Sequence, residues 1–475
     1  MWFDVKKIWA LKQYSNRKDL INWKFLLKTL VVLASIALIL FLARFVLGYV
    51  KKWAEKVWLT TTNIISQQFG EPMILDELGN INALIVWYSG IADWGWLLTD
   101  TIMVASFNPK LGAVTFLSIP RDLFVEYDTG FKWRLNGVYR TKYLATEWDE
   151  DAAAKALAAK VADVTWLEVP YYMLIDFEWF VTFIDELGGV DVDIREPIYD
   201  PYYPGPNNSY QIFQIAGGEQ YLSGDTALKY ARSRQTTSDF SRTLRQQQII
   251  KAVIKKVVWK VGTLQLNSLQ DLYSTFEQMM VTNVSMKQML GILPKVEALE
   301  FFFSFVYTAD CDLRYLDLTE PGCVLRHADR ASFWWAAVVI PEWASYGNLN
   351  YYKKTQDFAF WVTHHQEFLM EAADIGVFNG IDKQAARNAG YNVNGVASQL
   401  ALDLKIRWFN VIDIDNTEEF YDKTTLFLPG YGWYPATVDM LKSFVDIAEI
   451  RIDETWEFGS GGVSLILWQD YLNKL

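Results

Sequence analysis

A run of fifteen uncharged, mostly apolar residues near the start of the chain, 29–43, constrains the fold most. As a helix this run is only about 22 Å long, whereas the hydrocarbon core of a bilayer is about 30 Å thick. Extension to residues 26–50 reaches that thickness if the side chains of Lys28 and Arg44 extend toward opposite headgroup layers. We therefore expect one transmembrane helix over residues 26–50.

The segment before this helix is basic, since residues 1–28 hold seven Lys or Arg and two Asp. The positive-inside rule keeps such a flank in the cytoplasm. Residues 1–25 are therefore predicted to be a cytoplasmic leader, and residues after 50 to lie outside the cell membrane, in the extracellular or periplasmic space. A cleaved signal peptide is the alternative, although the leader is long and no clear cleavage site follows the apolar run.

Composition excludes several other classes of protein. With 51% hydrophobic residues the chain is not disordered, and its net charge of −12 argues against a broad nucleic-acid-binding surface, which needs many clustered basic side chains. Three His and two Cys argue against an all-protein zinc site. The cysteines, Cys311 and Cys323, either close a short disulfide loop outside the cytoplasm or remain as buried thiols.

Strands alternate with helices through the rest of the chain, which predicts an α/β fold with a mixed central sheet covered by helices. Residues 199–217, rich in Pro, Gly, Asn and Tyr, are expected to form a loop. In residues 300–370 the apolar residues show no clear helical or strand period. A second, small α/β unit is expected near the C-terminus. The expected strands are 83–88, 101–107, 113–119, 171–176, 190–194, 374–380, 409–414, 424–428 and 463–467, and the expected helices are 151–164, 177–187, one or two within 226–259, 395–407 and 436–448.

Four arginines lie close together in one stretch of the chain. Arg242, Arg245 and Gln246 share one face if their segment is helical, whereas Arg232 and Arg234 project together only from an extended piece or a helix end. Arginines that converge on one pocket can each hold two oxygens of a polyphosphate. The alternative is a solvated helix whose arginines pair with acidic side chains.

Polar residues also flank two of the predicted strands. Asp100 comes just before a strand, and Arg121 and Asp122 follow the next one. Folds of this class present ligands at the sheet edge where strands end, and an Asp there can hold a divalent cation that neutralises phosphate oxygens. A turn or capping role is the alternative for Asp100 alone.

These motifs occur together in a particular order. They include Thr99-Asp-Thr-Ile-Met-Val, Leu117-Ser-Ile-Pro-Arg-Asp, Arg134-Leu-Asn, Leu187-Gly-Gly-Val-Asp-Val, Leu222-Ser-Gly-Asp-Thr-Ala-Leu, Tyr230-Ala-Arg-Ser-Arg and Asp239-Phe-Ser-Arg-Thr-Leu-Arg-Gln-Gln. In this order they resemble the LytR-CpsA-Psr family. Residues 374–471 resemble, more weakly, the C-terminal domain often attached to that family.

The resemblance implies a membrane-anchored phosphotransferase that moves a glycopolymer from a polyprenyl-pyrophosphate carrier to a peptidoglycan sugar hydroxyl. Its expected partners are this lipid-linked glycan, peptidoglycan and the membrane, with no nucleic acid. It also implies Mg²⁺ or Mn²⁺ held by Asp100. The residues implied to bind pyrophosphate are Arg121, Arg134, Arg232, Arg234, Arg242, Arg245 and Gln246; those implied to be catalytic are Asp100, Arg121, Arg232 and Arg234; Asp122, Asn136 and Asp239 match further motif positions.

The resemblance also suggests where the domains lie. Residues 75–345 are expected to form the catalytic domain, 346–370 a connector, and 371–475 a LytR-type C-terminal domain. One departure is Leu98, where many family members have an Arg. Two other functions remain as alternatives: a surface module that binds lipid phosphate or cell wall without turnover, and a polyprenyl pyrophosphatase.

Tryptophan is unusually frequent, with 21 residues against 27 Gly. Several Trp stand where the family favours Gly, and Trp408 follows a predicted helix where a left-handed conformation is expected, which Gly adopts freely. One hypothesis is that many of these codons are UGA, which the source bacterium reads as glycine. The alternative is an aromatic surface that stacks on sugars or lies at the membrane interface. The positions concerned are Trp87, Trp94, Trp96, Trp166, Trp179, Trp408, Trp433 and Trp468.

Overall fold

A computed structural model of the chain places residues 66–475 in one compact unit. It describes residues 66, 70–88, 97–205, 209–233, 239–263, 280–309, 322–417, 423–429, 434–453 and 462–474. The expected membrane segment, Cys311 and Arg234 lie outside these residues. Among the residues described, no helix is both long enough and apolar enough to cross a membrane.

A seven-stranded mixed sheet is the main element of this unit, in the order β11-β6-β1-β2-β3-β12-β13. Its three central strands β1, β2 and β3 are antiparallel neighbours, while β6 runs parallel to β1 and β12 parallel to β3. The α/β class with a mixed sheet is therefore confirmed. The strands are β1 (Ile81–Tyr88), β2 (Thr99–Asn108), β3 (Ala113–Ile119), β6 (Tyr171–Asp176), β11 (Met280–Thr282), β12 (Phe301–Thr308) and β13 (Gly322–Cys323).

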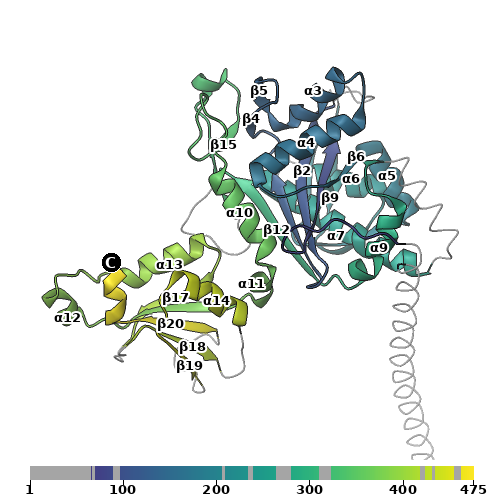
Figure 1. The fold of residues 1–475 in the computed structure, drawn as a ribbon. Helices are drawn as coiled ribbons and strands as arrows, with labels where there is room; N and C mark the ends of the chain where they lie inside the picture. The colour runs from purple at the N-terminus through teal and green to yellow at the C-terminus, as the bar shows by residue number, and fades with distance from the viewer. Residues whose placement is uncertain are drawn as a thin grey trace, which may run out of the picture. The chain divides into compact units, whose positions relative to one another are not determined.

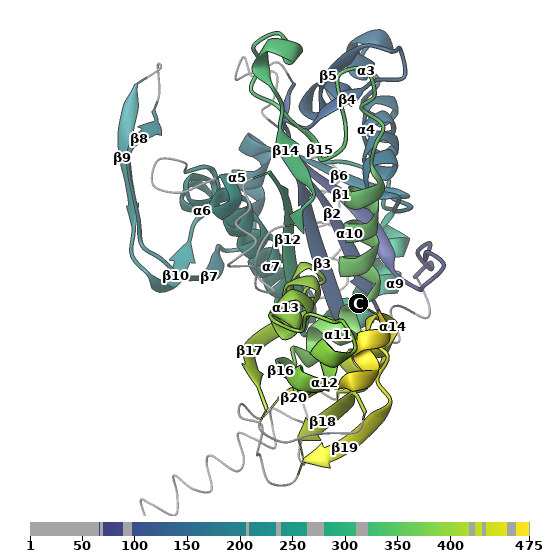
Figure 2. The same ribbon diagram turned by 90° about the vertical axis from the view of Figure 1, so that its left-hand side faces the viewer.

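Both faces of the sheet are covered, because alternate residues of each strand point to opposite sides. In β1, Leu84 and Val86 belong to one apolar core, and Ile85 and Trp87 belong to another. Helices pack on both sides (Figure 1, Figure 2). The first face is covered by α4 (Glu150–Thr165) and α10 (Lys353–His364), and the second by α5 (Phe177–Glu186), α6 (Gly224–Arg232) and α7 (Asp239–Thr263).

Local sequence signals set several helix ends. Asp149 caps α4 by accepting a hydrogen bond from the backbone N–H of Ala152, and Ser223 caps α6 in the same way. After α5 the chain turns at Gly188 and Gly189, whose φ angles of 79° and 75° are those of a left-handed helix cap.

The expectation of a loop over residues 199–217 is wrong. This segment forms a hairpin of β8 (Ile198–Pro204) and β9 (Tyr210–Ile215), and β10 (Gly218–Leu222) then pairs with β7 (Val190–Ile194). The Pro, Gly and Asn residues that indicated a loop are concentrated at 204–208, between the two strands. The Tyr, Ile and Phe residues on either side favour strands.

Residues 300–370, which show no clear period, contain the sheet strand β12 and the helix α10. Two hydrogen bonds fix α10 to the sheet. The Tyr307 hydroxyl donates to the carbonyl of Thr355 (2.5 Å), and the Thr115 hydroxyl donates to the carbonyl of Val362 (3.0 Å). The segment expected to be a connector therefore includes a helix packed on the central sheet.

A second sheet, in the order β17-β16-β20-β18-β19, is formed by residues nearer the C-terminus. The expected strands and helices are present here, although the helix expected over 436–448 ends at Phe444. The strand β19 and the short helix α12 are additional elements that the sequence did not indicate. The assignment of this unit as a LytR-type domain stays a prediction. Its elements are β16 (Asp374–Asn379), α12 (Lys383–Asn388), α13 (Val396–Ile406), β17 (Asn410–Asn416), β18 (Thr425–Pro429), α14 (Pro435–Phe444), β19 (Glu449–Asp453) and β20 (Val463–Leu467).

Candidate functional site

The ends of β1 and β6 and the start of β2 meet at one edge of the central sheet. This edge is the side of the sheet formed by strand ends, not by an outer strand. Tyr88, the last residue of β1, pairs with Asp176 at the end of β6 and with Thr99 at the start of β2. Burial, together with the nearby carboxylates of Glu150 and Asp176, raises the pKa of the Tyr88 hydroxyl. This tyrosine therefore stays neutral at physiological pH.

Asp100 and Arg121 form an ion pair at this edge. Ile102 of β2 lies opposite Ile119 of β3, and two residues further along, the Arg121 guanidinium donates a hydrogen bond to the carboxylate of Asp100. The side chains are 25% (Asp100) and 24% (Arg121) exposed. Both groups are thus held by the fold yet remain accessible to a ligand.

Asp122, Arg134 and Asn136 surround this pair. One carboxylate oxygen of Asp122 lies 3.7 Å from Nε of Arg121, and the other lies 3.3 Å from Nε of Arg134. The backbone N–H of Asn136 donates to the carbonyl of Arg121 (3.1 Å), and the Thr99 hydroxyl donates to the carbonyl of Asn136 (3.4 Å). The structure therefore joins five of the predicted site residues in one contact network.

The C-terminal end of α6 reaches the same edge. Arg232, the last residue of α6, places its guanidinium carbon 4.4 Å from the centre of the Phe177 ring. Phe177 directly follows Asp176 at the end of β6. A cation–π contact of this kind orients the guanidinium without neutralising its charge, so Arg232 can still bind an anion. Arg234 lies outside the residues that the structure describes.

On α7, Arg242, Arg245 and Gln246 lie on one helix face, as their spacing predicts, and the structure shows that all three are buried. Their burial contradicts the alternative of a solvated helix. The side-chain nitrogen of Gln246 lies 3.4 Å from the carbonyl of Ala231 near the end of α6. Asp239 is the first residue of α7, and its side chain lies outside the description.

Arg245 fixes the end of α6. Its guanidinium donates to the backbone carbonyls of Tyr230 (3.0 Å) and Ser233. Burial lowers the pKa of this guanidinium, while the nearby Tyr230 and Asp200 oppose the shift. These two carbonyls lie on either side of Arg232 in the chain. Arg245 therefore holds the backbone at the end of α6 in place, and it also contributes positive charge.

Two polar residues at this edge were not expected from the sequence. Gln247 is buried and donates from its side-chain amide to the hydroxyl of Ser118 (3.0 Å), three residues before Arg121. It thereby connects α7 to the end of β3. Asp176 is a buried carboxylate at the end of β6, and its place at a strand end is the signal that could have indicated it. Gln247 is the last residue of the motif that begins at Asp239, but nothing in that motif indicates a bond to β3.

A divalent cation at this edge would have Asp100 as its protein ligand. Among the residues described, no group of three or more His, Cys, Asp and Glu side chains is placed to hold a metal. Mg²⁺ needs few protein ligands, since it keeps several waters and usually binds one or two carboxylates together with substrate phosphates. A partly exposed carboxylate beside guanidinium groups that can hold those phosphates fits this mode of binding.

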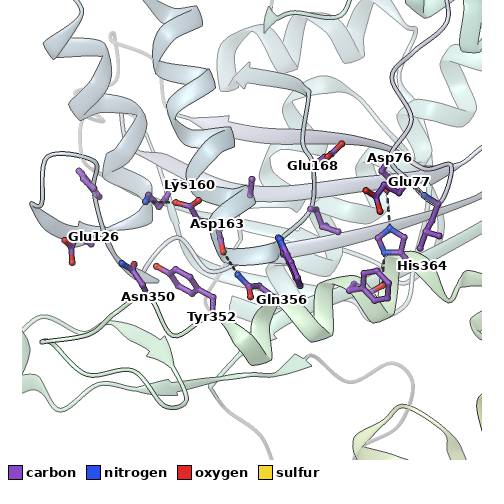
Figure 3. Close-up of a pocket in the computed structure, with 16 residues that line it drawn as sticks. Asp76, Glu77, Glu126, Lys160, Asp163, Glu168, Asn350, Tyr352, Gln356 and His364 are labelled. Atoms are coloured by element: carbon purple, nitrogen blue, oxygen red, sulfur yellow. Dashed lines mark hydrogen bonds and ion pairs between the residues drawn. The ribbon is translucent and has the colours of Figure 1, made fainter. Parts of the chain in front are cut away.

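A separate pocket of about 1040 Å³ lies between α4, α10 and the segment before β1 (Figure 3). None of the predicted site residues lines it. Nε2 of His364 lies 3.2 Å from the carboxylate of Asp76, and Nζ of Lys160 lies 2.8 Å from the carboxylate of Asp163. These side chains are paired with one another inside the chain, so they do not indicate a ligand.

Comparisons with known proteins match the region that carries this edge. Residues 96–300 match the model of the LytR_cpsA_psr family. The polyisoprenyl-teichoic acid-peptidoglycan teichoic acid transferase TagV of Bacillus subtilis (strain 168) is 31% identical over 166 residues, which are 34% of this chain and 39% of that protein. The transferase of the same description TagU of Bacillus mycoides (strain KBAB4) is 30% identical over 204 residues, 41% of this chain and 57% of that protein. The chain thus spans about half the length of these curated relatives.

Solved structures were found to be similar as well. The crystal structure of B. subtilis TagV covers 60% of this chain and 98% of its own, with 20% sequence identity and a TM-score of 0.42. A structure of TagT bound to LIIa-WTA covers 62% of this chain and 95% of its own, with 19% identity and the same TM-score.

Proposed function

Residues 96–300 belong to the LytR-CpsA-Psr family, as the sequence motifs predicted, and from this premise we propose that the chain is a glycopolymer transferase. It transfers a glycopolymer from a polyprenyl-pyrophosphate carrier to a sugar hydroxyl of peptidoglycan. The names of TagV and TagU, which are teichoic acid transferases acting on peptidoglycan, support this class of reaction.

The observation that carries the proposal is the meeting of Asp100 and Arg121 at the sheet edge, with Arg134 in the same network. Arg232, at the end of α6, packs on Phe177, which follows the last residue of β6. Phosphoryl transfer asks a protein mainly for positioning and for neutralisation of charge. Guanidinium groups serve both needs, because each can hold two phosphate oxygens in its own plane.

In the proposed reaction, the acceptor hydroxyl oxygen forms a bond to the phosphorus that carries the glycan. The bond from that phosphorus to the bridging oxygen of the pyrophosphate breaks, and polyprenyl phosphate leaves with the electron pair. The hydroxyl proton passes to solvent. Arg121 and Arg232 hold the pyrophosphate oxygens and stabilise the charge on the leaving phosphate. Mg²⁺ or Mn²⁺, when held by Asp100, supplies further neutralisation of the phosphate oxygens.

The proposal includes the membrane. Residues 26–50 would anchor the chain with its N-terminus in the cytoplasm and the site outside, as the basic flank predicts. A carrier with a long lipid tail stays in the bilayer, so an enzyme that acts on it must work at that surface. The anchor keeps the site there.

The proposal is tested with the full chain in liposomes that contain a polyprenyl-pyrophosphate-linked, radiolabelled glycan, with peptidoglycan added outside. We expect label to enter peptidoglycan, and Arg232→Ala to abolish this transfer. Lys155→Ala, on the exposed surface of α4, is the matched control and should transfer normally. Release of polyprenyl phosphate without labelled peptidoglycan would identify a pyrophosphatase, and lipid binding without any product would identify a binding module; either result refutes the proposal.

A further inference from the structure

Left-handed backbone in this protein is associated with tryptophan. Among the residues described, eight other than Gly have a positive φ, and five of the eight are Trp. Asn and Asp adopt this conformation more readily than other L-residues, yet neither is among the eight. The five are Trp148 (78°), Trp166 (59°), Trp334 (52°), Trp335 (63°) and Trp408 (63°), and the other three are Leu97, Glu147 and Ala372.

Trp408 occupies the position of a helix end that usually belongs to glycine. Its backbone N–H donates to the carbonyl of Lys405 (3.0 Å), and the N–H of Phe409 donates to the carbonyl of Leu404 (3.1 Å). This pair of bonds is the Schellman motif, whose left-handed residue is most often Gly. Trp408 therefore stands where the backbone of α13 requires a residue without a steric penalty at positive φ.

The other four also follow helices. Trp166 ends α4 and donates its N–H to the carbonyl of Ala162 (2.7 Å). Trp334 and Trp335 follow a short 3-10 helix, Arg330–Phe333. Trp148 follows α3 (Val138–Ala145) and donates to a carbonyl in its last turn. Each side chain is thus placed on a C-terminal turn that favours Gly.

The same chain uses glycine at the corresponding place of other helices. Gly188 and Gly189 follow α5, and Gly390 follows α12, all with positive φ. One structural position is therefore filled by Gly at some helix ends and by Trp, the largest side chain, at others.

The indole of Trp408 packs against the rings of Phe358 and Trp361, whereas the other four lie mostly at the surface. Four of the five side chains are largely exposed: Trp148 62%, Trp166 77%, Trp334 56% and Trp335 77%. Trp334 does stack on the ring of Trp133, with centroids 6.4 Å apart. A sugar-binding aromatic surface needs stacked rings but has no need of left-handed backbone, whereas glycine accounts for the backbone at all five.

We propose that these five positions are glycine in the protein as its own organism makes it. Their codons are UGA, which that organism reads as glycine and which a code with UGA as tryptophan renders as Trp. Trp87, Trp179 and Trp468 do not have positive φ, so the geometry makes no assignment for them. The inference is independent of the proposed transferase activity.

The gene and the native protein decide the matter. We expect UGA codons at residues 148, 166, 334, 335 and 408, and peptides from the protein purified from its organism should have the masses of glycine at these positions. UGG codons, or peptide masses that contain Trp there, would overturn the inference.

A stability measurement tests the physical reason separately. The full chain carrying Trp148→Gly, Trp166→Gly, Trp334→Gly and Trp335→Gly together should melt about 5 °C or more above the chain as printed, because the steric cost of left-handed backbone is removed. Trp343→Gly, at an exposed site without positive φ, is the matched control and should not raise Tm. An unchanged or lower Tm for the fourfold variant contradicts the proposal. Trp408 is left unchanged in this test because its ring packs 4.5 Å from that of Phe358.

Discussion

Asp100 and Arg121 are twenty-one residues apart in the sequence and form an ion pair at the edge of the central sheet. The antiparallel register of β2 and β3 brings them opposite each other. A carboxylate and a guanidinium held side by side can engage a cation and a phosphate at the same time. The proposed transferase activity depends on this arrangement.

Replacement of the carboxylate tests that dependence. We expect Asp100→Asn to lower the rate of glycan transfer by about 100-fold or more, as for the loss of a group that stabilises transition-state charge. The free energy of unfolding should change by less than about 1 kcal/mol, because a partly exposed ion pair contributes little. Transfer of labelled glycan and chemical denaturation measure the two effects. Asp357→Asn, which removes an exposed carboxylate paired with Lys353 on α10, is the control; equal activity of both variants would contradict the role of Asp100.

Arg245 should be important for the stability of the fold as well as for the site. Arg245→Met removes the donors to the carbonyls of Tyr230 and Ser233, and we expect the free energy of unfolding to fall by about 2–3 kcal/mol. Urea denaturation measures this change. Arg387→Met on the exposed surface of α12 should stay within about 0.5 kcal/mol of the original chain. If both variants unfold alike, Arg245 does not fix the end of α6.

Gln247 is predicted to couple α7 to the central sheet. Gln247→Leu keeps the volume of the side chain but removes the donor to the Ser118 hydroxyl and to the carbonyl of Phe305. A buried polar group that loses its partner costs about 1–3 kcal/mol of stability, and urea denaturation should show a loss of that size. Gln399→Leu, on the exposed face of α13, is the control. No difference between the two variants would argue against the coupling.

The stability of the protein should depend on pH through Asp76. Burial opposes ionisation of this carboxyl, but hydrogen bonds from Asn80 and Asn82 and the nearby His364 outweigh it and lower the pKa of Asp76 below 3.8. A carboxyl whose pKa is lower in the folded state stabilises that state above its unfolded pKa, and this stabilisation is lost as the pH falls through the folded pKa. Asp76→Asn should therefore be less stable at pH 7 and should lose less stability on acidification to below pH 3.8.

Denaturation midpoints at pH 7 and at successively lower pH check this prediction. Asp128→Asn, at an exposed position, serves as the control and should follow the original chain. An Asp76→Asn variant that shows the same acid dependence as the original chain would contradict the role assigned to Asp76.

Strand ends were the part of the site that the sequence could predict. Asp100 and Arg121 flank two apolar runs, and apolar runs separated by a tight turn pair as a hairpin, so their meeting follows from local pattern. The contact of Arg232 with Phe177 and the bond of Gln247 to Ser118 join segments far apart in the chain. Such contacts depend on how the helices pack on the sheet, which no local pattern encodes.

The elements of the fold divide in the same way, into those that a local sequence pattern predicts and those that depend on packing between distant segments. β1 and β3 could be read from their apolar runs, while β12 could not, because it lies in a stretch where apolar residues show no clear period and only three of its eight residues are buried. The hairpin of β8 and β9 was missed because the Pro, Gly and Asn of its turn outweighed the strand-forming Tyr and Ile around it.

The most direct test of the proposed activity is to identify the bond that the enzyme makes. The full chain is incubated in liposomes with the lipid-linked glycan and peptidoglycan, and the products are followed by phosphorus NMR. We predict a phosphodiester that joins the glycan to a peptidoglycan sugar, with one polyprenyl phosphate released for each diester formed and neither product from Arg121→Ala. Release of polyprenyl phosphate without any new diester, or no reaction with the unmodified chain, would contradict the proposed function.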